Sequence, residues 1–227
     1  MLLLKNYSKG RRKMKNKKIS ITGIAIICAF VIWTFLVKNI DVKAIGPKDS
    51  YVGFALLNGF FHNLIGVNMD LYVLTDWLGL VPVCFMFGFA MLGFFQLLKR
   101  KNLFKVDKDI LMLGGFYIII AAVYLFFENF IINYRPVLID GILEASYPSS
   151  TTLLIMCIMP TSAIQFKRRI KNVRLKKTSL WLISIFTVFM VTARLISGVH
   201  WLTDIIGGLL LSIGLVSIYY SIINLKR

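Results

Sequence analysis

The sequence predicts an all-α, polytopic membrane protein with six transmembrane helices and one amphipathic helix at the membrane interface. Two observations lead to this prediction. Of the 227 residues, 58% are hydrophobic and the mean hydropathy is +0.76, which is too apolar for an ordinary soluble domain. Several uncharged runs also reach the length of about 20 residues that a helix needs to cross the hydrocarbon core. Without an internal repeat or a second domain, we expect residues 1–227 to form a single membrane domain.

The basic residues are concentrated where cytoplasmic segments are expected. The net charge is +17, and most of the 27 Lys and Arg residues flank the hydrophobic runs, at 5–18, 99–108, 167–177 and 226–227. Only two acids, Asp107 and Asp109, lie in or beside these segments. This is the positive-inside pattern, and its anionic partner is the headgroups of the inner leaflet. We therefore expect a multi-pass protein of the cell membrane with both termini in the cytoplasm and no binding of nucleic acid.

The first predicted span follows a basic cytoplasmic tail, residues 1–18. Residues 19–37 carry no charge and are long enough to cross the membrane. Positive charge before an apolar run is also typical of a secretory signal peptide. The run is long for such a peptide and no small-residue cleavage site follows it, so we predict a retained span.

Residues 51–68 are also uncharged, but their pattern favours a helix that lies in the interface. Apolar residues recur with a near-helical period, while Asn58, His62 and Asn63 fall on other faces. The number of crossings agrees with this interpretation. The basic N-terminus and the basic segment at 99–108 belong on one side, which requires an even number of spans between them, and 77–98 is the second.

Four further spans are predicted after the basic segment at 99–108. The third, at 110–127, ends at Glu128, and Pro136 with the Asp140-Gly141 pair predicts an external loop. The fourth opens after Pro148 and ends at Phe166, before the basic segment at 167–177. The fifth and sixth occupy 179–193 and 205–225. With six spans, three polar segments lie on the external face: 128–135, 148–152 and 194–204.

The segment 193–204 holds the residues best suited to chemistry. An Arg, a His and an Asp lie between two long apolar runs, in a chain with only two histidines. On a helix, His200 and Asp204 would lie one turn apart, so that the carboxylate accepts a hydrogen bond from one ring nitrogen. The other nitrogen could then act as a nucleophile or general base. The structural alternative is that Thr203 or Asp204 caps the next helix, Arg194 extends to the membrane surface and His200 lies at a helix interface.

The external segments also contain groups that suit a phosphate. Arg135 and Arg194 carry planar guanidinium groups that match phosphoryl oxygens. Ser149 is placed as the N-cap of the fourth span, where free N–H groups and the helix dipole favour an anion. As a plain helix cap, Ser149 would need no ligand.

These three segments, in this order, resemble the motifs of the type 2 phosphatidic acid phosphatase superfamily, the membrane lipid phosphatases related to vanadium haloperoxidases. The family motifs are a Lys with Arg-Pro seven residues on, then Pro-Ser-Gly-His, then Ser-Arg with a His six residues after the Arg and an Asp four further. The corresponding segments here are 128–136, 148–151 and 193–204. The resemblance implies that His200 forms a phosphohistidine oriented by Asp204, and that the phosphate is bound by Arg135, Ser149, Ser150 and Arg194. It implies no metal and no other cofactor.

Four positions depart from the family motifs. Glu128 replaces the Lys, Ser150 the Gly, Thr151 the second-motif His, and Ala193 the Ser before the Arg. Glu128 weakens an anion site and could pair with Arg135 on a continuing helix. Thr151 removes the presumed general acid, a group that contributes about 10²–10⁴ in rate. His62, on the interfacial helix, could replace that acid or could be a structural residue.

The resemblance and the retained pair of His200 and Asp204 predict a membrane lipid phosphatase or diphosphatase. Its substrate would be a lipid phosphate of the phosphatidate or polyprenyl diphosphate type, hydrolysed on the external face. Glu128 and Thr151 favour an alternative, a non-catalytic protein that binds a lipid phosphate. A lipid phosphotransferase would use the same residues. The lipid and the oligomeric state are left open by the sequence.

Overall fold

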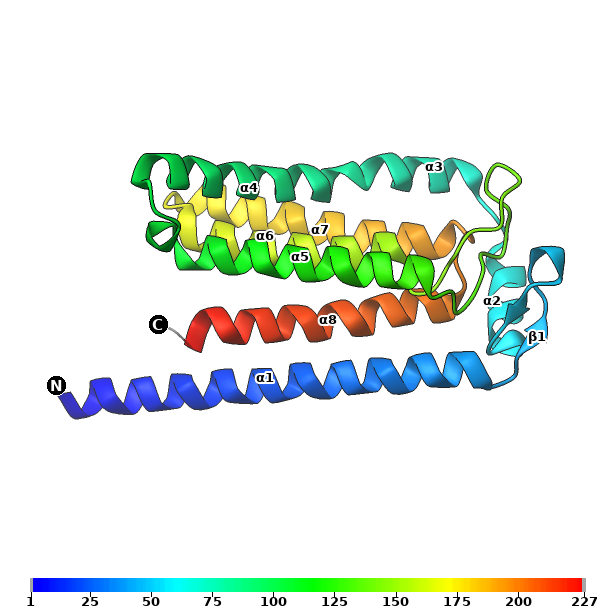
Figure 1. The fold of residues 1–227 in the computed structure, drawn as a ribbon, viewed down its shortest axis with the longest axis horizontal. Coiled ribbons are helices and arrows are strands. Elements are labelled where there is room, and N and C mark those ends of the chain that lie inside the picture. Colours follow the sequence, from blue (N-terminus) through cyan, green and yellow to red (C-terminus); the bar gives the residue numbers. More distant parts are fainter. Residues whose placement is uncertain (1, 226–227) are drawn as a thin grey trace.

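The computed structural model describes residues 2–225, which form a bundle of long, roughly parallel helices with a small cap at one end (Figure 1). A short helix, α3 (Met69–Leu78), continues almost directly into the long helix α4, with Gly79 between them. The chain is therefore the all-α, multi-pass membrane protein that the sequence predicts. The long helices are α1 (Leu2–Asn39), α4 (Leu80–Arg100), α5 (Lys108–Asn129), α6 (Ser150–Arg169), α7 (Val173–Ile196) and α8 (Leu202–Leu225).

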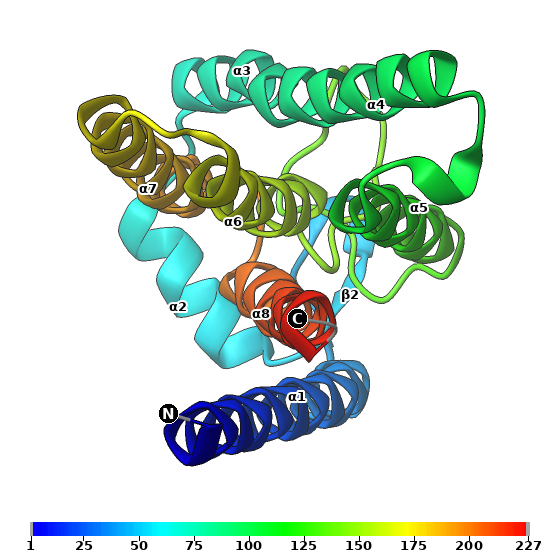
Figure 2. The same ribbon diagram turned by 90° about the vertical axis from the view of Figure 1, so that its left-hand side faces the viewer.

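One of the six predicted spans, α6, differs from the others in composition. Within the described residues, five segments are long and apolar enough to cross a membrane: α1 from Met14, α3 with α4, α5, α7, and α8 to Asn224. Helix α6, predicted as the fourth of six spans, is not among them, because its buried positions include Thr152, Thr161, Ser162 and Gln165. Viewed along the bundle, α6 lies between α5 and α7 and is flanked by α4 and α8 (Figure 2). Neighbouring helices rather than lipid surround it, so it can carry polar side chains.

The polar side chains of α6 are paired inside the bundle. Thr161 lies 3.2 Å from the hydroxyl of Tyr117 on α5, and Gln165 donates a hydrogen bond of 3.0 Å to Tyr219 on α8. Inside a bilayer no water is present to hydrogen-bond with such groups, so their burial requires partners of this kind.

Helix α1 is longer than its predicted span of 19–37. The segment predicted as a basic tail, 1–18, continues the same helix from Leu2. Ser221 of α8 donates a hydrogen bond of 2.8 Å to the carbonyl of Asn16, so the two helices still touch beyond the apolar run. The described chain begins and ends at the same end of the bundle (Figure 1). Lys226 and Arg227 of the predicted charge pattern lie outside the described residues.

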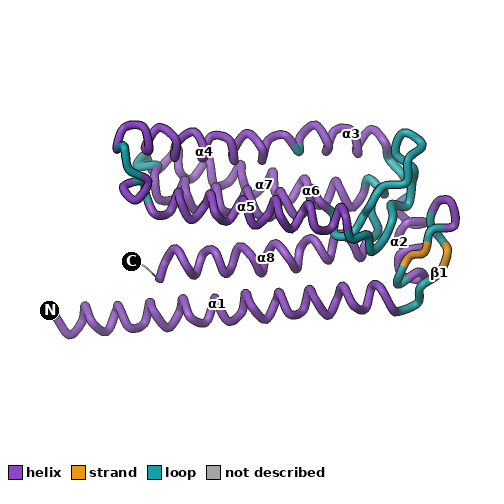
Figure 3. The backbone as a smooth tube through the Cα atoms, viewed as in Figure 1, coloured by secondary structure: helices purple, strands orange, loops and turns teal. Residues whose placement is uncertain are grey.

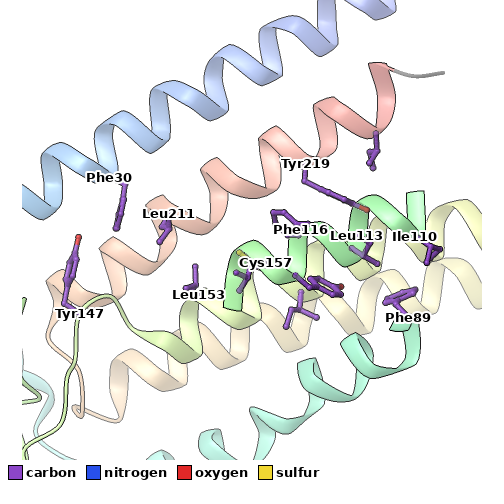
Figure 4. Close-up of a cluster of buried hydrophobic side chains, with 14 of the residues drawn as sticks. Phe30, Phe89, Ile110, Leu113, Phe116, Tyr147, Leu153, Cys157, Leu211 and Tyr219 are labelled. Atoms are coloured by element: carbon purple, nitrogen blue, oxygen red, sulfur yellow. The ribbon is translucent and has the colours of Figure 1, made fainter. Parts of the chain in front are cut away.

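Apolar side chains fill much of the interior between the helices. Figure 4 shows side chains from five helices meeting along the bundle: Phe30 of α1, Phe89 of α4, Leu113 of α5, Leu153 of α6 and Leu211 of α8. Lipid is as apolar as these side chains, so close packing, more than removal from water, stabilises this interior.

Apart from the turn at Gly79 between α3 and α4, the loops lie at the two ends of the bundle (Figure 3). The end with the chain termini also holds the short helix η2 (Leu103–Lys105) and an ion-pair cluster. There, Arg169 contacts Asp107 at 3.1 Å and Asp109 at 3.0 Å, and Arg100 contacts Asp107 at 2.9 Å. The two acids of the predicted cytoplasmic segments thus connect the start of α5 with the end of α6.

The opposite end, here called the capped end, carries the remaining short elements. A hairpin of β1 (Lys43–Ala44) and β2 (Tyr51–Val52), joined through η1 (Pro47–Asp49), leads into α2 (Ala55–Ile65). Helix α2 crosses the end of the bundle (Figures 1 and 2). The predicted amphipathic helix at 51–68 is therefore present but shorter, because its first residues pair with β1.

Helix α2 faces the bundle with its polar side. Leu56, Phe60 and Leu64 are exposed, whereas Asn58 is fully buried. The Asn58 amide donates a hydrogen bond of 2.9 Å to the Thr203 hydroxyl and accepts one of 3.2 Å from the Thr203 main-chain N–H. These bonds fix α2 to the first turn of α8, and its exposed apolar face is suited to the membrane interface.

Candidate active site

The three predicted polar segments meet at the capped end. Arg135 lies in the loop 130–149, Ser149 is the N-cap of α6, and His200 lies in the turn between α7 and α8. The Ser149 N–H donates a hydrogen bond of 3.1 Å to the Asp204 carbonyl, which joins the start of α6 to the start of α8. The capped end is therefore the candidate location of an active site.

The turn before His200 depends on a glycine. Gly198 has φ +68, a left-handed conformation that side chains disfavour, and a Cβ there would collide with the carbonyl of Gly66. The Asn68 N–H donates a hydrogen bond of 3.0 Å to the Ser197 carbonyl beside it. The α2–α3 connection thus holds the α7–α8 turn and sets the position of His200.

His200 and Asp204 lie close, but the predicted direct hydrogen bond between them is replaced by a bridge. His200 lies just before α8 rather than within it, and its Nδ1 is 4.0 Å from Asp204 Oδ2. The hydroxyl of Ser146 lies between them, 3.0 Å from His200 Nδ1 and 2.5 Å from Asp204 Oδ2. Because a carboxylate only accepts, the hydroxyl donates to Asp204 and accepts from Nδ1–H.

Asp204 has further donors, so it also has the structural role that the alternative interpretation proposes. It accepts hydrogen bonds of 3.0 Å from the Trp201 N–H, at the start of α8, and of 3.3 Å from the Asn133 amide. Asp204 thus closes the first turn of α8 beside His200, while Thr203 is hydrogen-bonded to Asn58.

The environment of His200 favours a neutral ring. The residue is 4% exposed, and burial lowers its pKa well below 6.5, with the positive charges of Arg135 and Arg194 lowering the pKa further. With the hydrogen on Nδ1, the lone pair is on Nε2, which is buried and has no hydrogen-bond partner among the described residues. A neutral imidazole in this state is a nucleophile.

The two predicted arginines converge on one aromatic ring. The guanidinium carbon of Arg194 lies 4.7 Å from the centroid of Tyr72 on α3, and that of Arg135 lies 5.9 Å from it. Both distances fit cation–π contacts. Tyr72 therefore brings together two positive charges that would otherwise repel each other.

Arg194 is held inside the fold and does not extend to the membrane surface. The residue is 1% exposed, and its Nη1 donates a hydrogen bond of 3.1 Å to the Thr75 hydroxyl. Asp76 lies 4.0 Å from Nη2, and Nε has no hydrogen-bond partner within the described chain. A buried cation with a free donor is suited to an anionic ligand.

Arg135 has an acidic neighbour that the sequence interpretation did not identify. Its Nε lies 3.0 Å from the Glu144 carboxylate, and its main-chain N–H bonds to the Glu144 carbonyl at 3.0 Å. The pair with Glu128 that a continuing helix would form is absent among the described residues, because α5 ends at Asn129 and Glu128 is exposed. Arg135 Nη1 is buried and has no hydrogen-bond partner there.

Ser149 is the helix cap that its position predicts. Its hydroxyl accepts hydrogen bonds from the Thr152 hydroxyl at 3.1 Å and, more weakly, from the Thr152 N–H at 3.5 Å. Ser150 and Thr151 form the first turn of α6 and are half-buried. The first N–H groups of a helix have no partner within it and can bind an anion.

The remaining predicted positions lie around this centre. Ala193, which precedes Arg194, is buried and lines an apolar groove between α3 and α7. His62 packs against Trp201 with ring centroids 5.4 Å apart, and it lines the same small cavity as His200. Burial lowers the pKa of His62, which favours its neutral form.

The sequence interpretation missed several residues of this centre. Ser146 and Asn133 contact Asp204, Glu144 contacts Arg135, and Tyr72 lies beneath both arginines. Ser146 precedes Pro148 by two residues, so a polar side chain beside the second motif was a usable signal. Nothing in the sequence marked Tyr72 as a site residue, because its neighbours in α3, residues 71–75, carry no charge.

Two comparisons with known proteins bear on the family and the fold. Residues 129–227 match the family model of the PAP2 superfamily and include every residue from Arg135 to Asp204. The chain is also similar to the crystal structure of the first transmembrane PAP2 type phosphatidylglycerolphosphate phosphatase from Bacillus subtilis, with a TM-score of 0.64. The two share 15% identity over 90% of this chain and 97% of that one. No curated protein matches the sequence. The C-terminal part of the chain, residues 129–227, thus matches the PAP2 superfamily, and the fold is similar to that of a transmembrane PAP2 type phosphatase.

Proposed function

We propose that the protein is a metal-independent membrane lipid phosphatase or diphosphatase that acts through a phosphohistidine at His200. The match of residues 129–227 to the PAP2 superfamily and the fold shared with a lipid phosphatase support lipid phosphatase activity in general. One observation carries the specific proposal. The buried, neutral His200 keeps its Nε2 lone pair beside the positive charges of two arginines, and both arginines have donors without a hydrogen-bond partner among the described residues.

The proposed reaction has two steps. The Nε2 lone pair of His200 attacks phosphorus, and the bond from phosphorus to the lipid-side oxygen breaks with its electron pair on that oxygen. Water then attacks the phosphorus, the N–P electron pair returns to Nε2, and phosphate leaves with the oxygen of the water while one proton passes to solvent. Arg135 and Arg194 stabilise the charge on the phosphoryl oxygens in both steps. Ser149 and Ser150, at the start of α6, offer further contacts.

Two alternatives use the same site. A lipid phosphotransferase would pass the phosphoryl group from His200 to an acceptor other than water. A non-catalytic protein would only bind the lipid phosphate, and the Glu144 carboxylate at Arg135 favours this alternative because it already neutralises part of the anion site. Turnover separates the three, since only hydrolysis releases inorganic phosphate.

The test is phosphate release by the purified full chain in mixed micelles with a panel of lipid phosphates. We expect release from at least one lipid, with inhibition by vanadate, which mimics the transferring phosphoryl group. Transfer of labelled phosphate to an added alcohol without release would indicate a transferase. Binding of the lipids without release or transfer would support the non-catalytic alternative.

We also propose that the capped end is external and that both termini are cytoplasmic. Single cysteines introduced near Asp140, at the capped end, and near Lys171, between α6 and α7, should differ in intact cells. An impermeant thiol reagent is expected to label the first and spare the second. The native cysteines Cys28, Cys84 and Cys157 are replaced in the parent protein, which serves as the unlabelled control. Labelling near Lys171 alone would reverse the topology and place the site on the cytoplasmic side.

A further inference from the structure

We infer that Ser146 is a positioning residue that connects Asp204 to His200 and fixes the hydrogen of His200 on Nδ1. This inference rests on the proposed function, because it assigns a role in the same reaction. It concerns a residue that neither the family motifs quoted above nor the spacing of His200 and Asp204 identifies.

The distances require a connecting group. His200 Nδ1 and Asp204 Oδ2 are 4.0 Å apart, which is too long for a direct hydrogen bond, whereas both lie within hydrogen-bond distance of Ser146 Oγ. A hydroxyl donates one hydrogen bond and accepts others, so it can serve both partners at once. The short contact of 2.5 Å to Asp204 is typical of a hydroxyl that donates to a charged oxygen.

The backbone holds Ser146 in place without help from its hydroxyl. The Ser146 N–H donates a hydrogen bond of 2.9 Å to the Asn133 carbonyl, and the Asn133 amide in turn contacts Asp204. The neighbouring residue Ala145 forms a bridge with Tyr134. Ser146 is 2% exposed, so water has little access to replace the hydrogen bonds between Ser146, His200 and Asp204. Its hydroxyl can therefore be removed while the main-chain contacts of the loop remain.

The chain of hydrogen bonds affects the reaction in two ways. Without an acceptor at Nδ1, the ring hydrogen would be free to move to Nε2, and Nε2 would then have no lone pair for attack. When Nε2 bonds to phosphorus, the ring becomes positive, and Nδ1–H is then a stronger donor to Ser146. The Ser146 hydroxyl, which donates to the Asp204 carboxylate, connects the positive ring to that carboxylate. No proton is transferred between these groups.

The kinetic test compares Ser146→Ala with Ser212→Ala. Ser212 is another buried serine, whose hydroxyl donates only to main-chain carbonyls of α8, at 2.6 Å to Gly208 and 3.1 Å to Leu209. Ser146→Ala should lower kcat about 10- to 100-fold, the loss expected for a hydrogen bond to a charged group. KM should change little, because Ser146 holds the histidine and not the phosphate. Ser212→Ala should keep the wild-type kcat.

A double mutant tests whether Asp204 acts through Ser146. If it does, Asp204→Asn should cost little more kcat in the Ser146→Ala protein, although it costs much in the wild type. Losses that multiply would show that Asp204 acts on His200 independently, which contradicts the inference. A wild-type kcat in Ser146→Ala would also contradict it.

A second measurement needs neither turnover nor a variant of Ser146. ¹⁵N NMR of the histidine-labelled full chain reports which ring nitrogen carries the hydrogen, and His62→Gln assigns the only other histidine. We expect His200 to carry it on Nδ1, and a hydrogen on Nε2 would overturn the inference even if Ser146→Ala did not fold. If the wild-type protein released no phosphate but kept the Nδ1 hydrogen, the proposed function would fail while the arrangement of Ser146 stood.

Discussion

Replacing His200 with Ala should lower phosphate release by about 10⁴-fold or more, because no other described residue combines its free ring nitrogen with an oriented partner. Loss of a nucleophile removes the covalent route entirely, whereas loss of a binding group only weakens it. The measurement is phosphate release in mixed micelles, with equal amounts of folded protein.

The same variant provides its own control for binding. Arg135, Arg194 and the start of α6 are unchanged in His200→Ala, so the lipid phosphate should still bind. A His200→Ala protein that binds and releases phosphate at the wild-type rate would show that the mechanism is wrong, whatever the family.

The second large effect concerns the substrate. We expect a lipid diphosphate, such as a polyprenyl diphosphate, to be hydrolysed faster than a monophosphate such as phosphatidic acid by about 10²–10⁴-fold, the usual contribution of a general acid. A monophosphate expels an alkoxide, which leaves poorly without a proton, and Thr151 cannot supply one at neutral pH. A diphosphate expels a lipid monophosphate, which is a far weaker base and needs little help.

The matched variant is Thr151→His. Thr151 is half-buried in the first turn of α6, where the family places its histidine. The substitution should raise monophosphate turnover more than diphosphate turnover in the same phosphate-release assay. Equal wild-type rates on both lipids, with no gain in Thr151→His, would contradict the argument and point to a substitute acid. His62, which shares a cavity with His200, is the residue to test next.

The fold was largely predictable from the sequence because hydropathy and charge act locally. Runs such as 110–127 and 205–225 carry their own signal, and the basic segments order them across the membrane. The polar side of α6 could not be predicted in this way, since Thr161 and Gln165 are explained only by Tyr117 and Tyr219 on other helices.

The residues of the candidate site that the sequence predicted are those with a short spacing or within the three motif segments. The spacing of His200 and Asp204 indicated a pair, but Ser146 reaches that pair from 54 residues before His200. Thr75 reaches Arg194 across 119 residues. Such contacts depend on how the capped end folds. The periodic pattern of a single segment cannot predict them.

Rapid chemical quench with a lipid substrate labelled at its terminal phosphate tests the central claim most directly. The full chain is mixed with substrate, quenched in alkali within milliseconds, and digested for mass spectrometry. We predict an acid-labile, alkali-stable phosphoryl group on His200 that is absent from His200→Ala. Label on another residue, or phosphate release with no labelled protein at any time, would contradict a phosphohistidine at His200.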